Sequence, residues 1–184
     1  MNKYTQLAKL INYPQSDFKE LTNFIIDTLS IGHPEVGEYL QSYKDAIEQL
    51  DLDQIREAYT TTFDLQQVCS LDVGYVIFGE DYKRGEFLVQ VQRLCREHQL
   101  DVGSELPDHM PNMLRLLPLL EQGLQAELVE KILYPAVEKM LDILNQGNSE
   151  KNYFSLPLKV IAEVFIKDFK IVKSKSLYGG DPCS

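Results

Sequence analysis

Apolar residues recur every three or four positions along most of the chain, which is the spacing of one buried face of an α-helix. Alternating strand patterns and Asn-Gly or Asp-Gly hairpin turns are missing. The only β-leaning stretch is Val73–Phe78, which we interpret as a buried helix. The pattern therefore predicts an all-α fold, a single bundle-like domain of seven to nine helices. The stretches with helical spacing are 18–29, 36–50, 55–63, 87–95, 111–121, 124–145 and 158–165. The first two are expected to bury the stripes Phe18, Leu21, Phe24, Ile25 and Leu29, and Val36, Leu40, Tyr43, Ile47 and Leu50.

Several helix starts are marked by capping residues. Asp17 with Glu20, and Asp51 with Gln54, have the three-residue spacing of a capping box. A further helix is expected to open near Asp81. The helices that begin after Asp17 and Asp51 are therefore expected to be capped by reciprocal hydrogen bonds between side chain and backbone.

Glycine and proline mark the expected helix ends. Gly123 is expected to end the helix before it, Pro135 to kink or break the long helix that contains it, and Gly147 to stop that helix. We expect residues 1–170 to form the helical domain and residues 171–184 to form a loose polar tail.

Charge narrows the class of partner. The 184 residues carry 18 basic and 28 acidic side chains, a net charge of −10. Residues 1–150 account for 12 basic and 25 acidic groups (−13), and residues 151–184 for 6 and 3 (+3). A negative field repels phosphate backbones, so nucleic acid is not expected as a partner. The charge favours a basic or apolar ligand, with ordinary solubility as the alternative.

Cysteine usage and hydropathy point to the cytoplasm. The first residues show no apolar signal-peptide core, and no stretch approaches the roughly 20 apolar residues of a membrane span. Cys69, Cys95 and Cys183 are widely spaced and odd in number, which predicts neither a disulfide framework nor a zinc site. We therefore expect a cytoplasmic protein with no membrane insertion, no metal and no cofactor.

Known catalytic motifs are missing from the chain. It has no phosphate-binding glycine loop, no dinucleotide fingerprint and no hydrolase or metalloprotease signature. His33, His98 and His109 are far apart in sequence. A small helical hydrolase that uses Cys69 or Cys95 with His109 is the alternative, but inert burial is expected of both thiols. The sequence thus predicts a protein that is not an enzyme.

Four dense signatures between residues 59 and 111 suggest a binding groove. In chain order they are Tyr-Thr-Thr-Thr-Phe-Asp from position 59, Ser-Leu-Asp-Val-Gly-Tyr-Val-Ile-Phe-Gly from 70, Glu-Asp-Tyr-Lys-Arg-Gly from 80 and Glu-Leu-Pro-Asp-His-Met-Pro from 105. Apolar side chains would line the groove and carboxylates would rim it, which suits a basic amphipathic peptide. The alternative is that the aromatic residues are core. The expected peptide-binding residues are Tyr59, Phe63, Asp64, Asp72, Tyr75, Phe78, Asp81, Leu106, Asp108, Met110 and Leu114.

Other residues of these signatures are expected to shape the backbone. Arg84 is expected to be a structural counter-ion held by Asp64 or Asp81. The remaining expected structural positions are Gly79, Gly85, Pro107 and Pro111.

These signatures resemble the motifs of the nitrate reductase delta-subunit (NarJ-like) chaperones, which are related to the TorD-type maturation proteins. The Leu-Ile-Asn-Tyr-Pro segment from position 10 is similar to the opening motif of the same family. The resemblance covers roughly residues 7 to 145. It implies an all-helical cytoplasmic chaperone, not an enzyme, that binds the N-terminal segment of a molybdopterin-containing catalytic subunit. It also implies that cofactor insertion is supported and that assembly or twin-arginine export is delayed until the cofactor is loaded.

Two features depart from the nitrate reductase members. The chain ends in a basic segment and Gly-Gly-Asp-Pro-Cys-Ser, where those members often carry an acidic tail. The stretch from Leu71 to Gly85 resembles more closely the chaperones of the type II dimethyl-sulfoxide-reductase group. The resemblance leaves the client open, and the alternative is a structural subunit retained in an oxidoreductase complex. We expect a monomer or a weak dimer.

Overall fold

A computed structural model describes residues 1–64, 69–146 and 152–172 of the chain. Its α-helices are α1 (Lys3–Leu10), α2 (Phe18–Gly32), α3 (Gly37–Glu48), α4 (Leu52–Phe63), α5 (Val73–Phe78), α6 (Tyr82–Glu97), α7 (Met110–Leu116), α8 (Gln122–Leu128), α9 (Tyr134–Gln146) and α10 (Ser155–Phe169). Two 3₁₀ turns, η1 (Pro34–Val36) and η2 (Leu117–Leu119), and a π-helical turn, η3 (Val129–Leu133), lie between them.

The described residues form only helices and their connections. Elements α8, η3 and α9 run without interruption over residues 122–146, so these parts of the chain contain nine separate helices. Val73–Phe78 is helical, as expected. The prediction of an all-α fold with seven to nine helices is confirmed.

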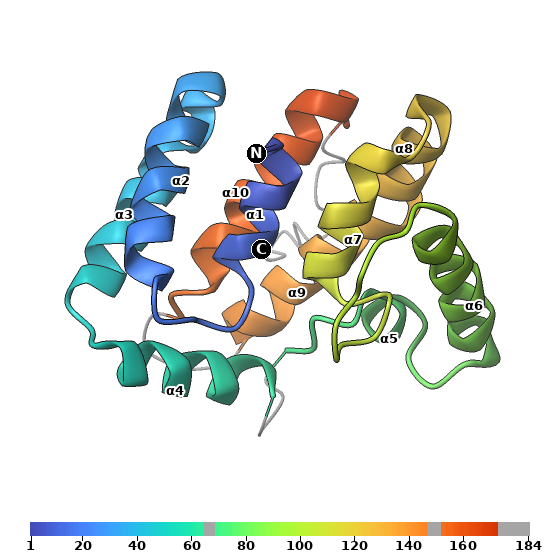
Figure 1. Cartoon of the computed structure of the whole chain (residues 1–184), viewed down its shortest axis with the longest axis horizontal. Helices are drawn as coiled ribbons and strands as arrows, with labels where there is room; N and C mark the ends of the chain where they lie inside the picture. Colours follow the sequence, from blue (N-terminus) through green and yellow to red (C-terminus); the bar gives the residue numbers. More distant parts are fainter. Residues whose placement is uncertain (65–68, 147–151, 173–184) are drawn as a thin grey trace, which may run out of the picture.

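Helix α10 lies at the centre of the bundle (Figure 1). It packs against α9, α3 and α1, and α1 packs in turn against α7. Helices α2 and α3 form a pair on one side, α4 crosses one end, and α5 and α6 lie on the opposite side from α2 and α3 (Figure 1). The two ends of the described chain meet where Lys3 forms an ion pair with Asp168 at 2.6 Å.

The predicted apolar stripes supply the core. Val36, Leu40, Tyr43 and Ile47 are all at most 2% exposed, which confirms the stripe on α3. Each such side chain contributes roughly 1.5–3 kcal/mol by leaving water. Phe24 was expected in the stripe on α2, and that prediction is wrong. Its side chain is 54% exposed, because the buried face of α2 is made by other residues: Phe18, Thr22, Ile25, Ile26 and Leu29.

One of the two predicted capping boxes forms. The Asp51 carboxylate accepts from the backbone N–H of Gln54 at 2.8 Å, and the Gln54 amide oxygen accepts from the N–H of Asp51 at 2.8 Å. The prediction of a capping box at Asp17 is wrong. Its ψ of 13° lies far from the extended value of Asp51, 171°, so its side chain makes no capping bond. Asp81 opens α6 as expected, accepting from Lys83 N–H at 2.9 Å.

The helix-breaking predictions have mixed outcomes. Gly123 lies inside α8 and ends nothing, because the preceding helix has already closed in η2 and Leu120 is extended. Pro135 does perturb its helix. It has no N–H to bond the carbonyl four residues earlier, and the π-helical turn η3 ends at Leu133, two residues before it. Gly147 and most of the expected tail, residues 173–184, lie outside the described residues.

Candidate functional site

The second and fourth signatures are hydrogen-bonded to each other at the start of α5. The backbone N–H of Val73 donates to the Asp108 carbonyl at 3.0 Å, and the N–H of Met110 donates to the Leu71 carbonyl at 2.9 Å. These hydrogen bonds join residues that lie 35 and 39 positions apart in the sequence.

The Asp108 side chain completes this junction. Its Oδ2 accepts from the backbone N–H of Gly74 at 2.8 Å. The Asp72 side chain, at the N-cap position of α5, makes no capping hydrogen bond, so Asp108 caps the helix instead. A Cβ atom on residue 74 would lie 2.7 Å from that oxygen, so the approach requires glycine. Asp108 is fully buried, and burial raises the pKa of its carboxyl above the ordinary value.

Asp72 links three residues at the edge of the junction. It accepts from the Arg84 guanidinium at 3.5 Å and lies 3.2 Å from Nδ1 of His109. The Arg84 guanidinium also lies 5.1 Å from the centre of the Tyr75 ring, within cation–π range. Arg84 is thus a counter-ion, as expected, and its partner is Asp72.

The predicted partners of Arg84, Asp64 and Asp81, are wrong. Asp81 caps the start of α6, where its side chain accepts from the backbone N–H of Lys83. Asp64 forms no ion pair with Arg84 and lies near Glu105 and His109, where burial and the Glu105 carboxylate raise the pKa of the Asp64 carboxyl. Sequence order could not separate these carboxylates, because only the docking of the fourth signature on α5 decides which of them faces Arg84.

Four of the expected peptide-binding residues lie in the core. Tyr59 and Phe63 are 3% and 4% exposed, and Met110 and Leu114 are fully buried. The ring of Tyr59 packs edge-on against Phe63 at 5.1 Å and Phe154 at 5.4 Å. These side chains are buried beneath the surface, so a ligand cannot contact them in this conformation.

The remaining apolar candidates reach the surface. Tyr75 and Leu106 are 40% and 43% exposed. Phe78 is half-buried, with its ring 5.8 Å from that of Phe87. Among the carboxylates, Asp64 and Asp81 are exposed and Asp72 is half-buried, whereas Asp108 is enclosed.

The expected structural positions differ in how strongly the fold constrains them. Gly79 ends α5 with a φ of 63°, a left-handed value that favours glycine. Pro111 is buried in the first turn of α7, and Pro107 is half-buried. Gly85 lies on the exposed side of α6 with open space around it, so no contact in the structure explains a glycine there.

A cavity of about 460 Å³ lies beside this junction. Two segments form its wall, residues 12–15 and residues 101–115, so the opening motif of the chain meets the fourth signature here. Its lining residues are Asn12, Tyr13, Gln15, Asp101, Val102, Gly103, Ser104, Glu105, His109, Pro111, Asn112 and Arg115.

Tyr13 stands at the rim of this cavity and of a second one. The second cavity, of about 230 Å³, continues towards Asp17 at the start of α2 and shares Tyr13 with the first. The Tyr13 ring is 39% exposed, packs edge-on against Tyr59 at 5.5 Å, and lies 5.9 Å from the Arg56 guanidinium. We call these two cavities and Tyr13 the Tyr13 groove.

Both signs of charge line the larger cavity. Asp101 and Glu105 are exposed acidic groups, and Asp64 is near enough to Glu105 for their charges to interact. Arg115 is the basic group, and it donates to Asn112 at 3.1 Å. Exposed carboxylates beside a partly exposed aromatic ring suit a basic, partly apolar ligand.

The sequence analysis did not select the groove residues Tyr13, Glu105 and His109 as binding positions. The signal was present, since Tyr13 belongs to the opening motif and the other two to the fourth signature. The sequence pattern does not show how these segments pack against each other, and that packing decides which side chains line the groove.

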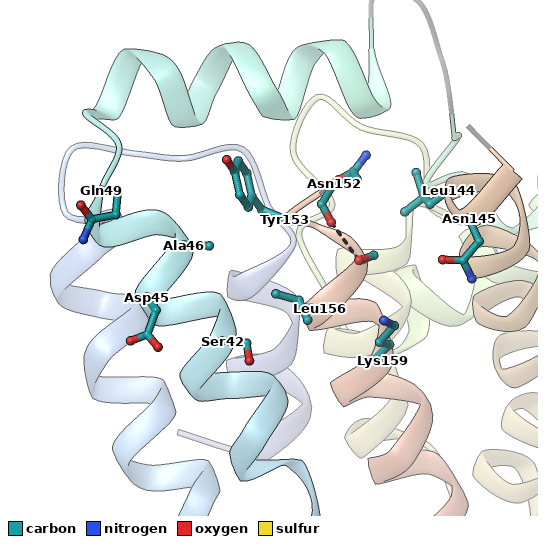
Figure 2. Close-up of a pocket in the computed structure, with 11 residues that line it drawn as sticks. Ser42, Asp45, Ala46, Gln49, Leu144, Asn145, Asn152, Tyr153, Leu156 and Lys159 are labelled. Carbon is teal, nitrogen blue, oxygen red and sulfur yellow. Dashed lines mark hydrogen bonds between the residues drawn. The ribbon is translucent and has the colours of Figure 1, made fainter. Parts of the chain in front are cut away.

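Another cavity, of about 800 Å³, lies between α3 and the facing ends of α9 and α10 (Figure 2). None of the expected binding residues lines it. Asn145 and Asn152 are among its lining residues, and Ser155 Oγ donates to the Asn152 carbonyl at 2.8 Å at the start of α10 (Figure 2). We assign no site to this cavity.

The described residues contain no cluster of three or more histidine, cysteine or acidic side chains that could hold a metal ion. Cys69 and Cys95 are both buried, and burial raises the pKa of the Cys69 thiol to about 12. A thiol with so high a pKa is a poor nucleophile at neutral pH, which counts against the hydrolase alternative. No described helix combines the length and apolar character needed to cross a bilayer.

The chain was compared with models of known protein families. The family model described as nitrate reductase delta subunit matches residues 33–147, which are 115 of the 184 residues. The match includes all four signatures. No curated protein matches the chain.

Proposed function

The chain belongs to the nitrate reductase delta subunit family, whose members are maturation chaperones of molybdoenzymes, and on that premise we propose that it binds the N-terminal segment of a molybdenum oxidoreductase catalytic subunit. The bound segment is held competent for cofactor insertion, and assembly or export waits until the cofactor is loaded. We place this activity in the cytoplasm. The protein performs no catalytic step of its own in this role.

The observation that carries the proposal is the Tyr13 groove. It joins two motifs from opposite ends of the family signature set, and it has a partly exposed aromatic ring between two hollows. Leu106 lies on the segment that forms one wall and is 43% exposed. Apolar side chains of the client segment would bury these surfaces, which supplies most of the affinity of such a complex.

Charge supplies the orientation and speed of the encounter. Asp64, Asp101 and Glu105 present carboxylates at or near the groove, on a chain of net charge −10. A client segment that carries arginine or lysine is drawn to this field, and a nucleic acid is repelled.

The proposal is tested by calorimetric titration of the full chain with synthetic N-terminal peptides of molybdenum-enzyme catalytic subunits encoded nearby. One peptide is expected to bind. Leu106→Ser and Glu105→Gln are each expected to weaken it by about tenfold, which corresponds to about 1.4 kcal/mol.

Matched variants control for general effects of these changes. Leu119 is 44% exposed but lies in η2, outside the groove, so Leu119→Ser is expected to leave the affinity unchanged. Glu121→Gln removes an exposed charge outside the groove in the same way. Equal losses of affinity from Leu106→Ser and Leu119→Ser would show that the groove is not the binding site. If none of the peptides binds, the proposal is overturned.

Co-purification separates the chaperone from a retained structural subunit. A chaperone is expected to accompany the catalytic subunit before cofactor insertion and to be absent from the mature oxidoreductase. A stoichiometric amount in the mature enzyme would support the subunit alternative.

A further inference from the structure

Helix α6 presents a regular row of exposed side chains to solvent. At steps of three, four, three and four, which is the spacing of a coiled-coil seam, the helix carries Tyr82, Gly85, Val89, Gln92 and Arg96. All five residues are exposed, and the exposed fractions of Tyr82 and Val89 are 72% and 64%. We call these five residues the α6 seam.

The seam lies on a side of α6 that the bundle leaves uncovered. Helix α6 is at the edge of the molecule and packs mainly against α5 (Figure 1). Its buried residues are Val91 and Cys95, which lie on a different face of the helix. An exposed tyrosine and valine at core spacing are therefore not used by the fold of one chain.

The glycine of the seam is not explained by contacts within the described chain. A Cβ atom on Gly85 would meet no atom within 4 Å, and its φ is not positive. Glycine is also a poor helix former, so local helix stability does not favour it. A residue without a side chain does allow a second helix to approach closely at that point.

The charges beside the seam are arranged as their own complement. Glu86 precedes Val89 by three positions and Arg93 follows it by four, on the same side of the seam. If a second α6 lies antiparallel with Val89 against Val89, Glu86 of each copy lies within about 1.5 Å, along the helix axis, of Arg93 of the other. Tyr82 and Arg96 are each seven positions from Val89, so each tyrosine ring meets an arginine of the other copy.

The groups that would pair are available for an intermolecular contact. Among the described residues, the side chains of Glu86 and Arg96 form no ion pair or hydrogen bond. Arg93 donates through Nε to Glu97 at 2.8 Å, which leaves the terminal nitrogens of its guanidinium for a second carboxylate. Residues 82–97 contain four basic and two acidic side chains, on a chain of net charge −10. This surface therefore does not suit the basic client segment, whereas it does suit a second α6.

We propose that two copies of the chain associate through antiparallel α6 seams. Val89 meets Val89 at the two-fold axis, and the Glu86–Arg93 and Tyr82–Arg96 contacts repeat on both sides of it. No residue of the seam lines the Tyr13 groove, so the contact does not depend on the client. One pair of helices buries less than the roughly 1,200 Å² of a standard interface, so the dimer is weak and forms at high protein concentration.

Sedimentation equilibrium of the full chain measures this association. The average mass is expected to rise from monomer towards dimer between about 10 µM and 1 mM. Glu86→Arg and Arg93→Glu are each expected to weaken the association about tenfold, because like charges then face each other. Glu57→Arg makes the same charge change at an exposed position of α4 and is expected to have no effect. A monomer at every concentration, or equal weakening by Glu57→Arg, would overturn the proposal.

A mixture of the two charge variants tests the pairing directly. In a mixed dimer of Glu86→Arg with Arg93→Glu, opposite charges again face each other at both pairs. The one-to-one mixture is therefore expected to associate as strongly as the wild type, although each variant alone does not. A mixture that associates no better than its components contradicts the pairing of Glu86 with Arg93.

Disulfide cross-linking identifies the surface that joins the copies. All cross-linking variants carry Cys183→Ser, and Cys69 and Cys95 are buried. On mild oxidation, Val89→Cys is expected to form covalent dimers, because the two copies of this residue meet at the axis. Phe24→Cys, at a 54% exposed position of α2, is the control and is expected to stay monomeric. Dimers that form no faster from Val89→Cys than from Phe24→Cys would place the contact on another surface and overturn the proposal.

A second pair of cysteine variants determines the direction of the helices. Tyr82→Cys and Arg96→Cys, mixed in the same background, are expected to cross-link to each other faster than either cross-links to itself. Faster cross-linking of each variant to itself would indicate parallel helices and would overturn the antiparallel pairing. Circular dichroism of every variant checks that these exposed substitutions leave the helical fold intact.

Discussion

Asp108 caps helix α5 from a position 34 residues beyond Gly74, with its Oδ2 accepting the Gly74 N–H at 2.8 Å. The approach is so close that a Cβ atom on residue 74 would lie 2.7 Å from the same oxygen. This contact fixes how the fourth signature lies on the second and thereby holds one wall of the Tyr13 groove.

Replacement of Gly74 by alanine is expected to destabilise the fold. Gly74→Ala forces Asp108 or the start of α5 to move, at a cost of about 1–3 kcal/mol in the free energy of unfolding. Urea denaturation measures the change. Gly85→Ala is the control, because residue 85 has open space around it and alanine is the better helix former. Equal effects of the two substitutions would mean that the close approach at Gly74 is not a constraint.

The pH dependence of stability reports on Asp108. Since burial raises the pKa of its carboxyl in the folded state, the protonated form is favoured there. Its contribution is fully present below the unfolded value, about 4, and is lost as the pH rises through the raised folded value. The unfolding free energy of the wild type minus that of Asp108→Asn is therefore expected to fall with rising pH across this window. A difference that grows with pH would show that Gly74 and Arg84 stabilise the ionised form more than burial disfavours it.

A double-mutant cycle tests the Arg84–Asp72 pair. Arg84→Ala and Asp72→Asn are expected to be coupled by about 0.5–1 kcal/mol, a modest value because both side chains are about one quarter exposed. The same cycle with Asp81→Asn in place of Asp72→Asn is expected to show no coupling. Coupling of Arg84 to Asp81 instead would restore the pairing that the sequence suggested.

Tyr59 and Phe78 are expected to respond differently to truncation. Tyr59→Ala opens a cavity among Phe63, Phe154 and Tyr13 and is expected to cost about 3–5 kcal/mol, enough to compromise the fold. Phe78→Ala removes a half-buried ring and is expected to leave a folded protein. Circular dichroism during thermal unfolding measures both. A stable Tyr59→Ala variant with lost peptide affinity would return Tyr59 to the binding surface.

Salt is expected to slow association with the client peptide. The acidic groups near the Tyr13 groove are exposed, so added salt screens them and lowers the association rate constant, while dissociation changes little. Stopped-flow kinetics at several salt concentrations measures both rates. An association rate that is independent of salt counts against the acidic rim.

Local patterns predicted most of the fold. The stripe from Val36 to Ile47 became the buried face of α3, and the box at Asp51 formed. The box at Asp17 has the same residue spacing and failed, because the backbone there does not adopt the extended geometry that a cap needs. Phe24 follows helical spacing yet faces solvent, since spacing alone does not say which part of an apolar arc meets a neighbour.

The candidate site was less accessible to sequence reasoning than the fold. The motif segments were located, but the side chains that they expose were not. Tyr59 and Met110 are buried in the core, whereas Tyr13 and Glu105 are exposed. The difference comes from contacts between segments that are far apart along the chain, such as Asp108 with Gly74, and no single segment contains that information.

Helix α5 also constrains the order in which the protein can fold. It has six residues, too few to persist in water without support. Its first turn is bonded to Asp108, and all of α6 lies in between along the chain. A chain emerging during synthesis can therefore complete α6 early, but α5 must await the segment around residue 108. The groove wall is consequently a late product of folding, acquired only after the loop that contains α6 has closed.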